Sequence, residues 1–213
     1  MSTPRLYTYF RSGAAHRVRI ALALKGVAYE SVPVHLVRDG GEHLKPAFRA
    51  LNPQARVPVL ELAGGERLIQ SPAILEYLEE TVPTPRLLPQ DPVARAKVRG
   101  VAAIIGCDVH PLNNVAVLNT LRQLGQDEAA VRNWIARWIT DGLTAVEQLI
   151  GDDGWCFGAS PGLADVYLVP QLLSARRFSV PLDSYPRIAR VAALADAHPC
   201  FIAATPEHHP DAA

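Results

Sequence analysis

The chain has 213 residues, of which 49% are hydrophobic and 20% charged, a balance that suits a packed globular protein of one or two domains. Its 21 Lys and Arg residues cancel its 21 Asp and Glu residues, which excludes the strong basic field of a protein that binds nucleic acid or an anionic membrane. The N-terminus lacks an apolar stretch of signal-peptide length, and no later run approaches about 18 uninterrupted apolar residues. We therefore expect a cytoplasmic protein that binds neither nucleic acid nor membrane.

Three cysteines, Cys107, Cys156 and Cys200, lie far apart in the sequence. An odd number at these spacings suits neither a disulfide framework nor a metal site. We expect three reduced thiols without a catalytic role, and no bound metal.

The first eighty residues alternate short β-like runs with helical stretches, which is typical of an α/β domain. The predicted strands are residues 6–10, 29–36, 57–62 and 66–69, and the predicted helices are residues 14–25, 42–51 and 72–81. Gly26 is expected to end the first helix in a left-handed conformation, and Gly64 and Gly65 to turn the last two strands into a hairpin. Ser71 is the expected N-cap of the third helix. The order is β-α-β-α-β-β-α.

A proline-punctuated stretch at residues 82–89 favours no helix and predicts the domain linker. Beyond it the strand pattern disappears, and apolar residues recur at helical spacing behind a predicted N-cap at Asp127. We therefore expect one domain at residues 1–83 and an all-helical domain at residues 92–213. The tail, with His208 and His209, is expected to be loosely held and solvated.

Several motifs point to one family. Residues 6–26, 51–53, 57–58 and 70–78, and in the second half residues 107–114, 163–171 and 175–178, closely resemble the zeta-class glutathione transferases. Within that class the second-half motifs resemble bacterial maleylacetoacetate and maleylpyruvate isomerases. The resemblance implies a glutathione transferase fold, with a thioredoxin-like N-terminal domain and an all-α C-terminal domain. It also implies glutathione as cofactor, a small dicarboxylate substrate, isomerisation of a maleyl compound in aromatic catabolism, and a homodimer.

Ser12 is the expected stabiliser of the cofactor's thiolate. A Ser at the turn from a strand to a helix can direct its hydroxyl at a thiolate, beside the first free amides of that helix. A simple N-cap explains the same local pattern, and the resemblance favours the catalytic role. Residues 1–83 contain no cysteine and the chain has no Cys-X-X-Cys motif, so the thiol must come from outside and a thioredoxin-type reductase is excluded.

The resemblance assigns the other glutathione contacts. Ser71 and Gln70, at a helix start that favours an anion, would hold the γ-glutamyl carboxylate. Val57, before an expected cis-Pro58, would offer its backbone N–H and carbonyl to the cysteinyl residue. His43 would meet the glycyl carboxylate.

A dianionic substrate requires cationic donors, preferably arginines. Arg11, beside Ser12, is the first candidate, and it is expected to take part in catalysis. Arg177 and Arg176 follow, because the resemblance favours one of them facing the site, whereas the pattern alone makes them surface residues. His110 and Asn114 are expected to reach glutathione and substrate, although the pattern alone places them at a kink beside a proline.

The chain departs from the family pattern in two places. Gly13 and Ala14 stand where relatives commonly have Ser and Cys, and Val115 and Ala116 stand where several bacterial isomerases carry an arginine. The second departure removes one anion contact and bears on the preferred dicarboxylate. Asp165, near a glycine cap, is interpreted as structural.

Two rival functions remain open at this point. One is a glutathione transferase that consumes the thiol on small haloacids or other electrophiles. The other is a non-catalytic adaptor with the same fold, against which the retention of Ser12, Pro58 and Ser71 argues.

Overall fold

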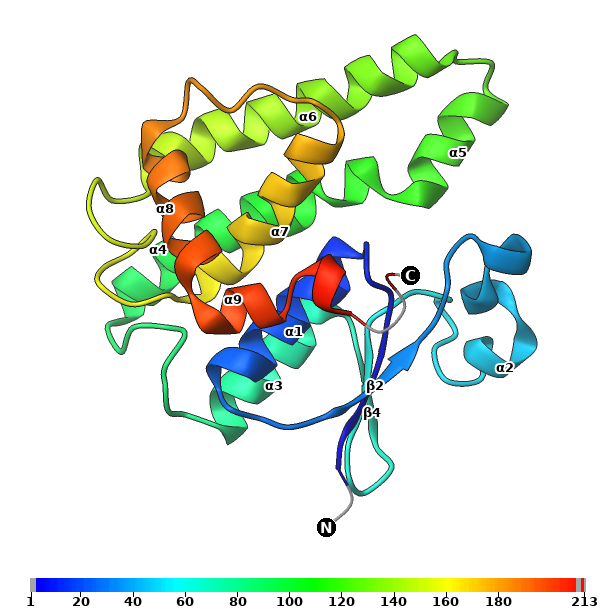
Figure 1. Ribbon diagram of the computed structural model, residues 1–213, viewed down its shortest axis with the longest axis horizontal. Helices are drawn as coiled ribbons and strands as arrows, with labels where there is room; N and C mark the ends of the chain where they lie inside the picture. Colours follow the sequence, from blue (N-terminus) through cyan, green and yellow to red (C-terminus); the bar gives the residue numbers. More distant parts are fainter. Residues whose placement is uncertain (1–2, 210–211, 213) are drawn as a thin grey trace. The chain divides into compact units, whose positions relative to one another are not determined.

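The computed structural model describes residues 3–209 and 212, which form two compact units (Figure 1). The first unit comprises the residues up to Arg86 together with those from Ala197 onward, and the second comprises Leu87–Asp196. The first unit is therefore built from two separate stretches of chain.

A four-stranded mixed sheet forms the centre of the first unit. Its strands are β1 (Arg5–Thr8), β2 (Glu30–Pro33), β3 (Val59–Glu61) and β4 (Arg67–Ile69), in the order β2-β1-β3-β4. β1 pairs parallel with β2 and antiparallel with β3, and β3 pairs antiparallel with β4. Helices α1 (Gly13–Leu24) and α3 (Ser71–Thr81) pack against each other beside the sheet (Figure 1). The predicted element order and the hairpin are confirmed, although the strands are shorter than predicted.

The predicted helix at residues 42–51 is wrong in its extent. The connection from β2 to β3 contains the short 3₁₀ turns η1 (Arg38–Gly40) and η2 (Glu42–Leu44) and then the single-turn helix α2 (Pro46–Arg49). Lys45 separates η2 from α2 with extended backbone angles, φ −69° and ψ 149°. The residue before a proline is disfavoured in helical geometry, so Pro46 interrupts the predicted helix.

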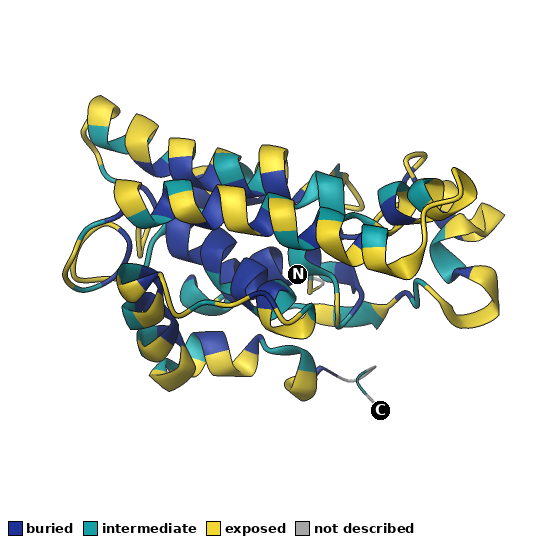
Figure 2. Ribbon diagram, turned by 90° about the horizontal axis from the view of Figure 1, so that it is seen from above, coloured by how far each residue is buried: buried dark blue, intermediate teal, exposed yellow. Residues whose placement is uncertain are grey.

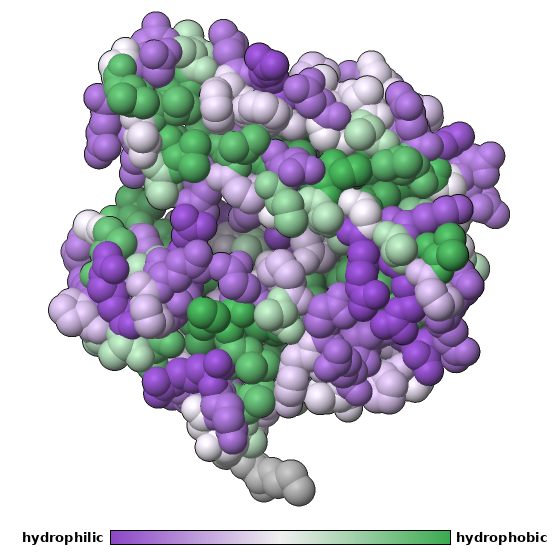
Figure 3. Space-filling model, turned by 180° about the vertical axis from the view of Figure 1, so that it is seen from behind, coloured by the Kyte–Doolittle hydropathy of each residue, from purple (hydrophilic) through white to green (hydrophobic). Residues whose placement is uncertain are grey.

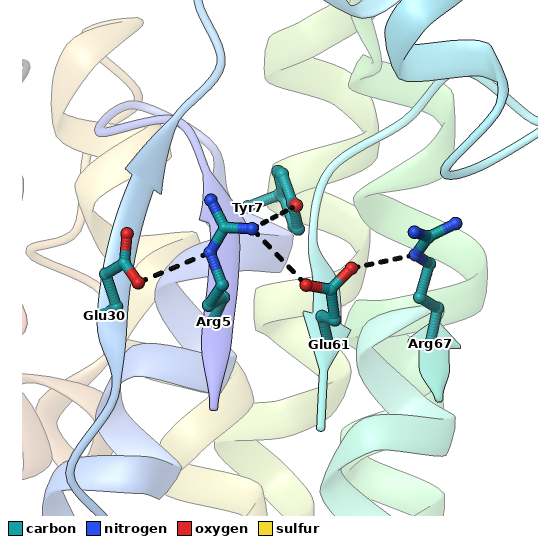
Figure 4. Close-up of polar contacts among 5 residues, drawn as sticks. All are labelled: Arg5, Tyr7, Glu30, Glu61 and Arg67. Atoms are coloured by element: carbon teal, nitrogen blue, oxygen red, sulfur yellow. Dashed lines mark hydrogen bonds and ion pairs between the residues drawn. The ribbon is translucent and has the colours of Figure 1, made fainter. Parts of the chain in front are cut away.

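A row of alternating charges crosses all four strands (Figure 4). The register aligns Glu30, Arg5, Glu61 and Arg67 in sheet order. Arg5 Nε lies 3.3 Å from Glu30 Oε2, Arg5 Nη1 lies 3.4 Å from Glu61 Oε1, and Arg67 Nε donates to Glu61 Oε2 at 2.9 Å. Hydrogen bonds from Arg67 and then Arg5 lower the pKa of Glu61. Because solvent reaches these groups, we expect the row to favour the observed strand register and to contribute little to stability.

The C-terminal end of α1 is held by a buried cation. Gly26 follows the helix with a φ of +64°, as predicted for a left-handed cap. The Lys25 side chain is fully buried, and its Nζ donates to Glu79 Oε2 at 2.8 Å and to the carbonyls of Val82 and Pro85 at 2.6 and 3.0 Å. This cluster ties α1 to α3 and to the start of the proline-rich stretch.

The segment from residue 197 onward includes helix α9 (Pro199–Ala203) and the 3₁₀ turn η5 (Pro206–His208). α9 packs on α1. His209 is only 7% exposed, and its Nε2 lies 2.8 Å from Ser31 Oγ on β2. The prediction of a loose, solvated tail is therefore wrong at His209, which is buried and hydrogen-bonded to the sheet, whereas His208 is exposed as predicted. Residues 210, 211 and 213 lie outside the described residues.

The second unit is helical, as predicted. Its elements are α4 (Pro92–Ala103), the π-helical segment η3 (Ile104–Val109), the 3₁₀ turn η4 (Pro111–Asn113), α5 (Val115–Gln123), α6 (Glu128–Leu149), α7 (Leu163–Arg177) and α8 (Pro186–Ala197). Asp127 caps α6 by accepting from the Ala130 N–H at 2.7 Å. Buried and exposed residues alternate along the long helices (Figure 2). A Cβ at Gly142 would collide with the Val109 side chain, so this glycine allows α6 and η3 to approach closely.

Asp165 is structural in the second unit, as predicted. Its Oδ2 accepts from the Gly162 N–H at 2.8 Å, which closes the cap of α7, and its Oδ1 accepts from the Cys156 N–H at 2.9 Å. Burial raises the pKa of this carboxyl.

Apolar residues also reach the surface, scattered among hydrophilic ones on the face that Figure 3 shows. The run Pro92–Gln123 contains an 18-residue window of mean hydropathy 1.4, which qualifies it as a candidate membrane span by length and composition. That evidence is weak, because core helices of soluble proteins pass the same test. In this chain η3, η4 and the proline at position 111 divide the run.

We predict that Glu79→Gln lowers the free energy of unfolding by roughly 3 kcal/mol, because the buried Lys25 ammonium loses its counter-charge. Urea denaturation followed by circular dichroism measures the change. The double variant Lys25→Met/Glu79→Met is the control and is expected to lose less than Glu79→Gln, since it leaves no unpaired charge in the interior. A Glu79→Gln protein as stable as the parent would contradict this prediction.

Candidate functional site

Three of the predicted site segments meet at one edge of the sheet. β1 and β4 run in the same direction, and β3 runs opposite to both. The ends of β1 and β4 and the start of β3 therefore lie at the same edge, where Tyr7, Val59 and Ile69 are paired across the three strands. Pro58 directly precedes Val59, Ser71 lies two residues after Ile69, and Ser12 lies five residues after Tyr7. Topology brings together residues that lie up to about sixty positions apart.

Ser12 is the N-cap of α1. Its backbone N–H donates to the Tyr9 carbonyl at 2.9 Å, and its Oγ accepts from the Ala15 N–H at 3.2 Å. The cap interpretation is thus confirmed, and it leaves the hydroxyl hydrogen available as a donor. The side chain is half-buried at a helix N-terminus, where an anion is favoured. The cap and a thiolate contact are compatible, because the two hydrogen bonds run in opposite directions.

Arg11 is exposed, and its guanidinium carbon lies 4.8 Å from the centroid of the Phe10 ring. The stacked guanidinium keeps its donors at its edge, where they are able to bind a carboxylate. Arg11 is therefore placed beside the Ser12 turn in a form suited to anion binding.

The Val57–Pro58 peptide bond is cis, as predicted. Both residues are buried and come just before the paired residues of β3. Val57 thus lies outside the sheet ladder, and its backbone N–H and carbonyl suit an extended peptide ligand.

The start of α3 differs from prediction by one residue. Gln70 is the N-cap and Ser71 is the first helical residue, because the Gln70 carbonyl accepts the Ile74 N–H at 3.0 Å. The predicted N-cap role of Ser71 is therefore wrong. Gln70 has a φ of +70°, which a non-glycine residue rarely adopts, and its Nε2 donates to Gln54 Oε1. Backbone strain of this kind is typical of ligand-binding positions.

Ser71 itself is 3% exposed. Its position in the first turn of α3 puts its hydroxyl and backbone amide at the positive end of an eleven-residue helix. This arrangement still favours a carboxylate, and it does so without the predicted cap.

His43 lies in η2, half-buried, with its Nδ1 buried and without a hydrogen-bond partner among the described residues. Desolvation and then Arg49 lower the pKa of His43, so the ring is neutral at pH 7. It would therefore serve a carboxylate as an N–H donor and not as a cation.

In the second unit, His110 lies between η3 and η4, and Asn114 is the N-cap of α5, accepting from the Ala116 N–H at 3.0 Å. The neighbouring Asn113 was missed by sequence reasoning. Its Oδ1 and Nδ2 are both buried without a hydrogen-bond partner among the described residues. An unsatisfied buried amide is costly, so Asn113 is the better candidate for a ligand contact. The signal was available, because a helix starting at Val115 commits Asn114 to capping.

Arg176 and Arg177 are both exposed at the end of α7, where they differ in their contacts. Arg176 Nη2 lies 3.5 Å from Asp196 Oδ2, whereas the Arg177 guanidinium carbon lies 5.3 Å from the centroid of the Phe178 ring. The ion pair already satisfies part of the Arg176 charge. Arg177 is therefore the stronger candidate for an anionic ligand.

All three cysteines are free. Cys156 is buried, and desolvation followed by the charge of Asp165 raises the pKa of its thiol, which makes it inert. Cys200 donates from Sγ to the Ala23 carbonyl at 3.5 Å, and Cys107 is exposed.

The residues at the sheet edge fit the tripeptide glutathione. Two helix N-termini and a half-buried hydroxyl suit its carboxylate and its thiolate, and the backbone beside the cis-proline suits its peptide bonds. The buried Ser71, in the first turn of α3, suits a ligand with a terminal carboxylate.

Comparison with known proteins agrees with this geometry. Residues 11–81 match the family model of the glutathione S-transferase N-terminal domain. The maleylacetoacetate isomerase of Pseudomonas aeruginosa is 65% identical over 207 residues, which cover 97% of this chain and 98% of the relative. A holo structure of maleylpyruvate isomerase, a bacterial zeta-class glutathione transferase, matches with a TM-score of 0.93 and 52% identity, covering 98% of this chain and 100% of that one.

A further structure, the maleylacetoacetate isomerase of Anaeromyxobacter dehalogenans, holds dicarboxyethyl glutathione and citrate in its active site. It matches with a TM-score of 0.88 and 42% identity, and it covers 99% of this chain and 94% of its own. The predicted fold class, a thioredoxin-like domain followed by helices, and the family resemblance are confirmed.

We predict that Ser12→Ala folds but loses roughly ten-fold to more than a hundred-fold in kcat/KM, because a hydrogen bond to a charged partner contributes about 1.5 to 3 kcal/mol. Loss of the cap is expected to cost a further 0.5 to 2 kcal/mol of stability, roughly, which thermal denaturation separates from the kinetic effect. Ser12→Thr, which keeps both the hydroxyl and the cap, is the control. Full activity of Ser12→Ala with an unchanged pH profile would remove Ser12 from the catalytic residues.

We predict different roles for the two asparagines before α5: Asn114 stabilises the helix and Asn113 contacts a ligand. Asn114→Ala should lower stability by about 1 kcal/mol through loss of the cap and leave KM nearly unchanged. Asn113→Ala should keep its stability and raise KM for glutathione or for the dicarboxylate roughly two-fold to ten-fold, the range of one hydrogen bond. Steady-state kinetics with each substrate varied in turn tests both variants. A raised KM in Asn114→Ala with an unchanged KM in Asn113→Ala would show that Asn114 is the ligand contact.

Proposed function

The chain belongs to the zeta class of the glutathione transferases, and from this premise we propose that it is a glutathione-dependent cis–trans isomerase of a maleyl dicarboxylate. Maleylacetoacetate and maleylpyruvate are the candidate substrates, and the catabolism of aromatic compounds is the proposed setting. The observation that carries the proposal is the 65% identity to a maleylacetoacetate isomerase in a chain that keeps Ser12, cis-Pro58 and Ser71 at one sheet edge.

When bound, glutathione would supply a nucleophilic thiolate for reversible addition to the cis double bond, so that the bond could rotate and glutathione would be regenerated. Ser12 would stabilise that thiolate through its hydroxyl, together with the positive end of α1. A thiol with a pKa near 8.5 is only about 3% ionised at pH 7, so a reduction of roughly two units increases the thiolate about twenty-five-fold.

Binding of glutathione is assigned to residues from four segments. Gln70 and Ser71 would hold its γ-glutamyl carboxylate, Val57 with Pro58 would pair with its backbone, and His43 would donate to its glycyl carboxylate. His110 and Asn114 complete the set that the resemblance implies. Of the two asparagines, Asn113 is the preferred contact, because its buried amide is unsatisfied whereas Asn114 caps α5.

Activation of the thiol accounts for part of the rate only. Orientation of the substrate and stabilisation of the negative charge that develops on it must supply the larger share. Arg11 adjoins Ser12 and would respond to that developing charge. Arg177, or failing that Arg176, would bind the more distant carboxylate throughout the reaction.

Three further features belong to the proposal. The chain works in the cytoplasm without a membrane or nucleic-acid partner, and it forms a homodimer as implied by its class. Residues 1–83 bind glutathione, and residues 92–196 form the pocket for the second substrate. The residues from Ala197 onward, which the sequence assigned to the second domain, belong to the first unit. Gel filtration with light scattering tests the dimer.

An absorbance assay with maleylpyruvate and maleylacetoacetate, each with and without glutathione, tests the function. Turnover of either compound only in the presence of catalytic glutathione supports the proposal. Consumption of glutathione with haloacids, without isomerisation, would instead support a transferase. Binding of glutathione without turnover of any electrophile would support the adaptor, for which the strained Gln70 and buried Ser71 have no evident use.

We predict that Arg177→Met raises KM for the dicarboxylate roughly ten-fold to more than a hundred-fold, since a partly shielded charge-assisted contact contributes about 1.5 to 3 kcal/mol. The KM for glutathione should stay nearly unchanged. Arg11→Met is expected to lower kcat as well, because it loses an interaction that strengthens during the reaction.

Arg176→Met is the matched control for Arg177→Met. Its ion pair with Asp196 is exposed, so the change should leave KM near the parent value. If Arg177→Met behaves like the parent and Arg176→Met raises KM, the two assignments are exchanged.

A further inference from the structure

Arg19 is a buried cation that the proposed mechanism does not use. It lies on α1, two turns after Ser12, and is 1% exposed. A buried guanidinium is costly unless its donors are bonded, so its position calls for an explanation in terms of what those donors contact.

The contacts converge on the turn that precedes Ser12. Arg19 Nη1 donates to Thr8 Oγ1 at 3.0 Å and to the Tyr9 carbonyl at 3.3 Å, and Nη2 donates to the Phe10 carbonyl at 3.1 Å. Thr8 is the last residue of β1. Arg19 therefore donates hydrogen bonds to three successive residues, from the last residue of β1 to the residue before Arg11.

One of these acceptors is shared with Ser12. The Tyr9 carbonyl accepts from the Ser12 N–H at 2.9 Å as well as from Arg19. The backbone conformation at Tyr9 therefore determines where Ser12 and Arg11 lie relative to α1. Displacements of about 1 Å at a reacting centre are enough to reduce rates about a hundred-fold.

The fourth contact brings in the distant end of the chain. Arg19 Nε donates to the Ala204 carbonyl, just after α9, at 3.1 Å. The single guanidinium group of Arg19 thus connects the turn before Ser12 to the segment that follows residue 197. A lysine has the charge but not the geometry to bond several carbonyls in different directions.

We propose that Arg19 is a positioning residue that holds the Tyr9–Phe10 turn, so that Ser12 and Arg11 meet the bound thiol in the correct place. This inference rests on the proposed function of Ser12. It assigns to Arg19 no contact with glutathione or with the dicarboxylate.

The test is Arg19→Lys, read out by ultraviolet titration of the thiol of bound glutathione and by steady-state kinetics. The thiol pKa is expected to rise by about one unit, and kcat at pH 7 to fall roughly ten-fold to a hundred-fold. Thr8→Val removes one acceptor without changing side-chain size, and it should shift both readouts in the same direction by less. It keeps the proposal testable if Arg19→Lys does not fold.

Glu79→Gln is the matched control. It disturbs a second buried cation on the same helix, Lys25, at the end remote from Ser12. It is expected to lower the melting temperature while leaving the thiol pKa unchanged and kcat within about two-fold of the parent. Arg19→Lys or Thr8→Val proteins that lose stability but titrate like the parent would show that Arg19 only supports the fold.

The two proposals fail in different ways. A parent protein that ionises bound glutathione but isomerises neither maleyl compound would contradict the proposed function and leave the titration of the Arg19 variants valid. An unchanged thiol pKa in both Arg19→Lys and Thr8→Val overturns the role of Arg19, whatever the substrate.

Discussion

The direction of the strands is the constraint on which the candidate site depends. Because β1 and β4 run together and β3 runs against them, three separate segments arrive at the same edge of the sheet. Two of them start helices, whose free amides favour an anion, and the third is the backbone at Val57, outside the sheet ladder. A sheet with one strand reversed would scatter these groups even if every side chain were kept. The convergence of these groups is therefore first a property of the topology and only then of particular residues.

The hydroxyl of Ser12 caps α1 and, in the proposed mechanism, would also stabilise the thiolate. Ser12 accepts a hydrogen bond through a lone pair to cap the helix and retains its hydrogen for a ligand. Because both the cap and the proposed thiolate contact use the Ser12 hydroxyl, Gly13 and Ala14 are able to replace the Ser and Cys of many relatives without loss of a group that either contact needs. The missing arginine near Val115 is different, because no group among its neighbours in the sequence replaces that charge.

Features encoded locally were predicted well from the sequence. The element order, the left-handed Gly26, the hairpin and the cap at Asp127 each depend on a few adjacent residues. The wrong predictions concern positions whose conformation depends on contacts with residues far away in the sequence. Gln70 takes the cap position from Ser71 through a backbone conformation that no propensity favours, and His209 is anchored by Ser31, which lies far away in the sequence. The candidate site was predicted through family resemblance more than through pattern, and the role of Arg19 became visible only with its acceptors in place.

The first unit is completed by residues that are synthesised after the whole of the second. During translation the sheet, α1 and α3 leave the ribosome early, but the carbonyl at Ala204 and the partner of Ser31 arrive more than a hundred residues later. Until then the Arg19 guanidinium lacks one of its acceptors and the face of α1 that α9 covers is open to solvent. During synthesis every residue of the helical unit therefore becomes available before the first unit is complete. A fragment that ends at residue 81, where the match to the N-terminal family model ends, would keep Ser12, Pro58 and Ser71 and still lack the Ala204 carbonyl to which Arg19 donates.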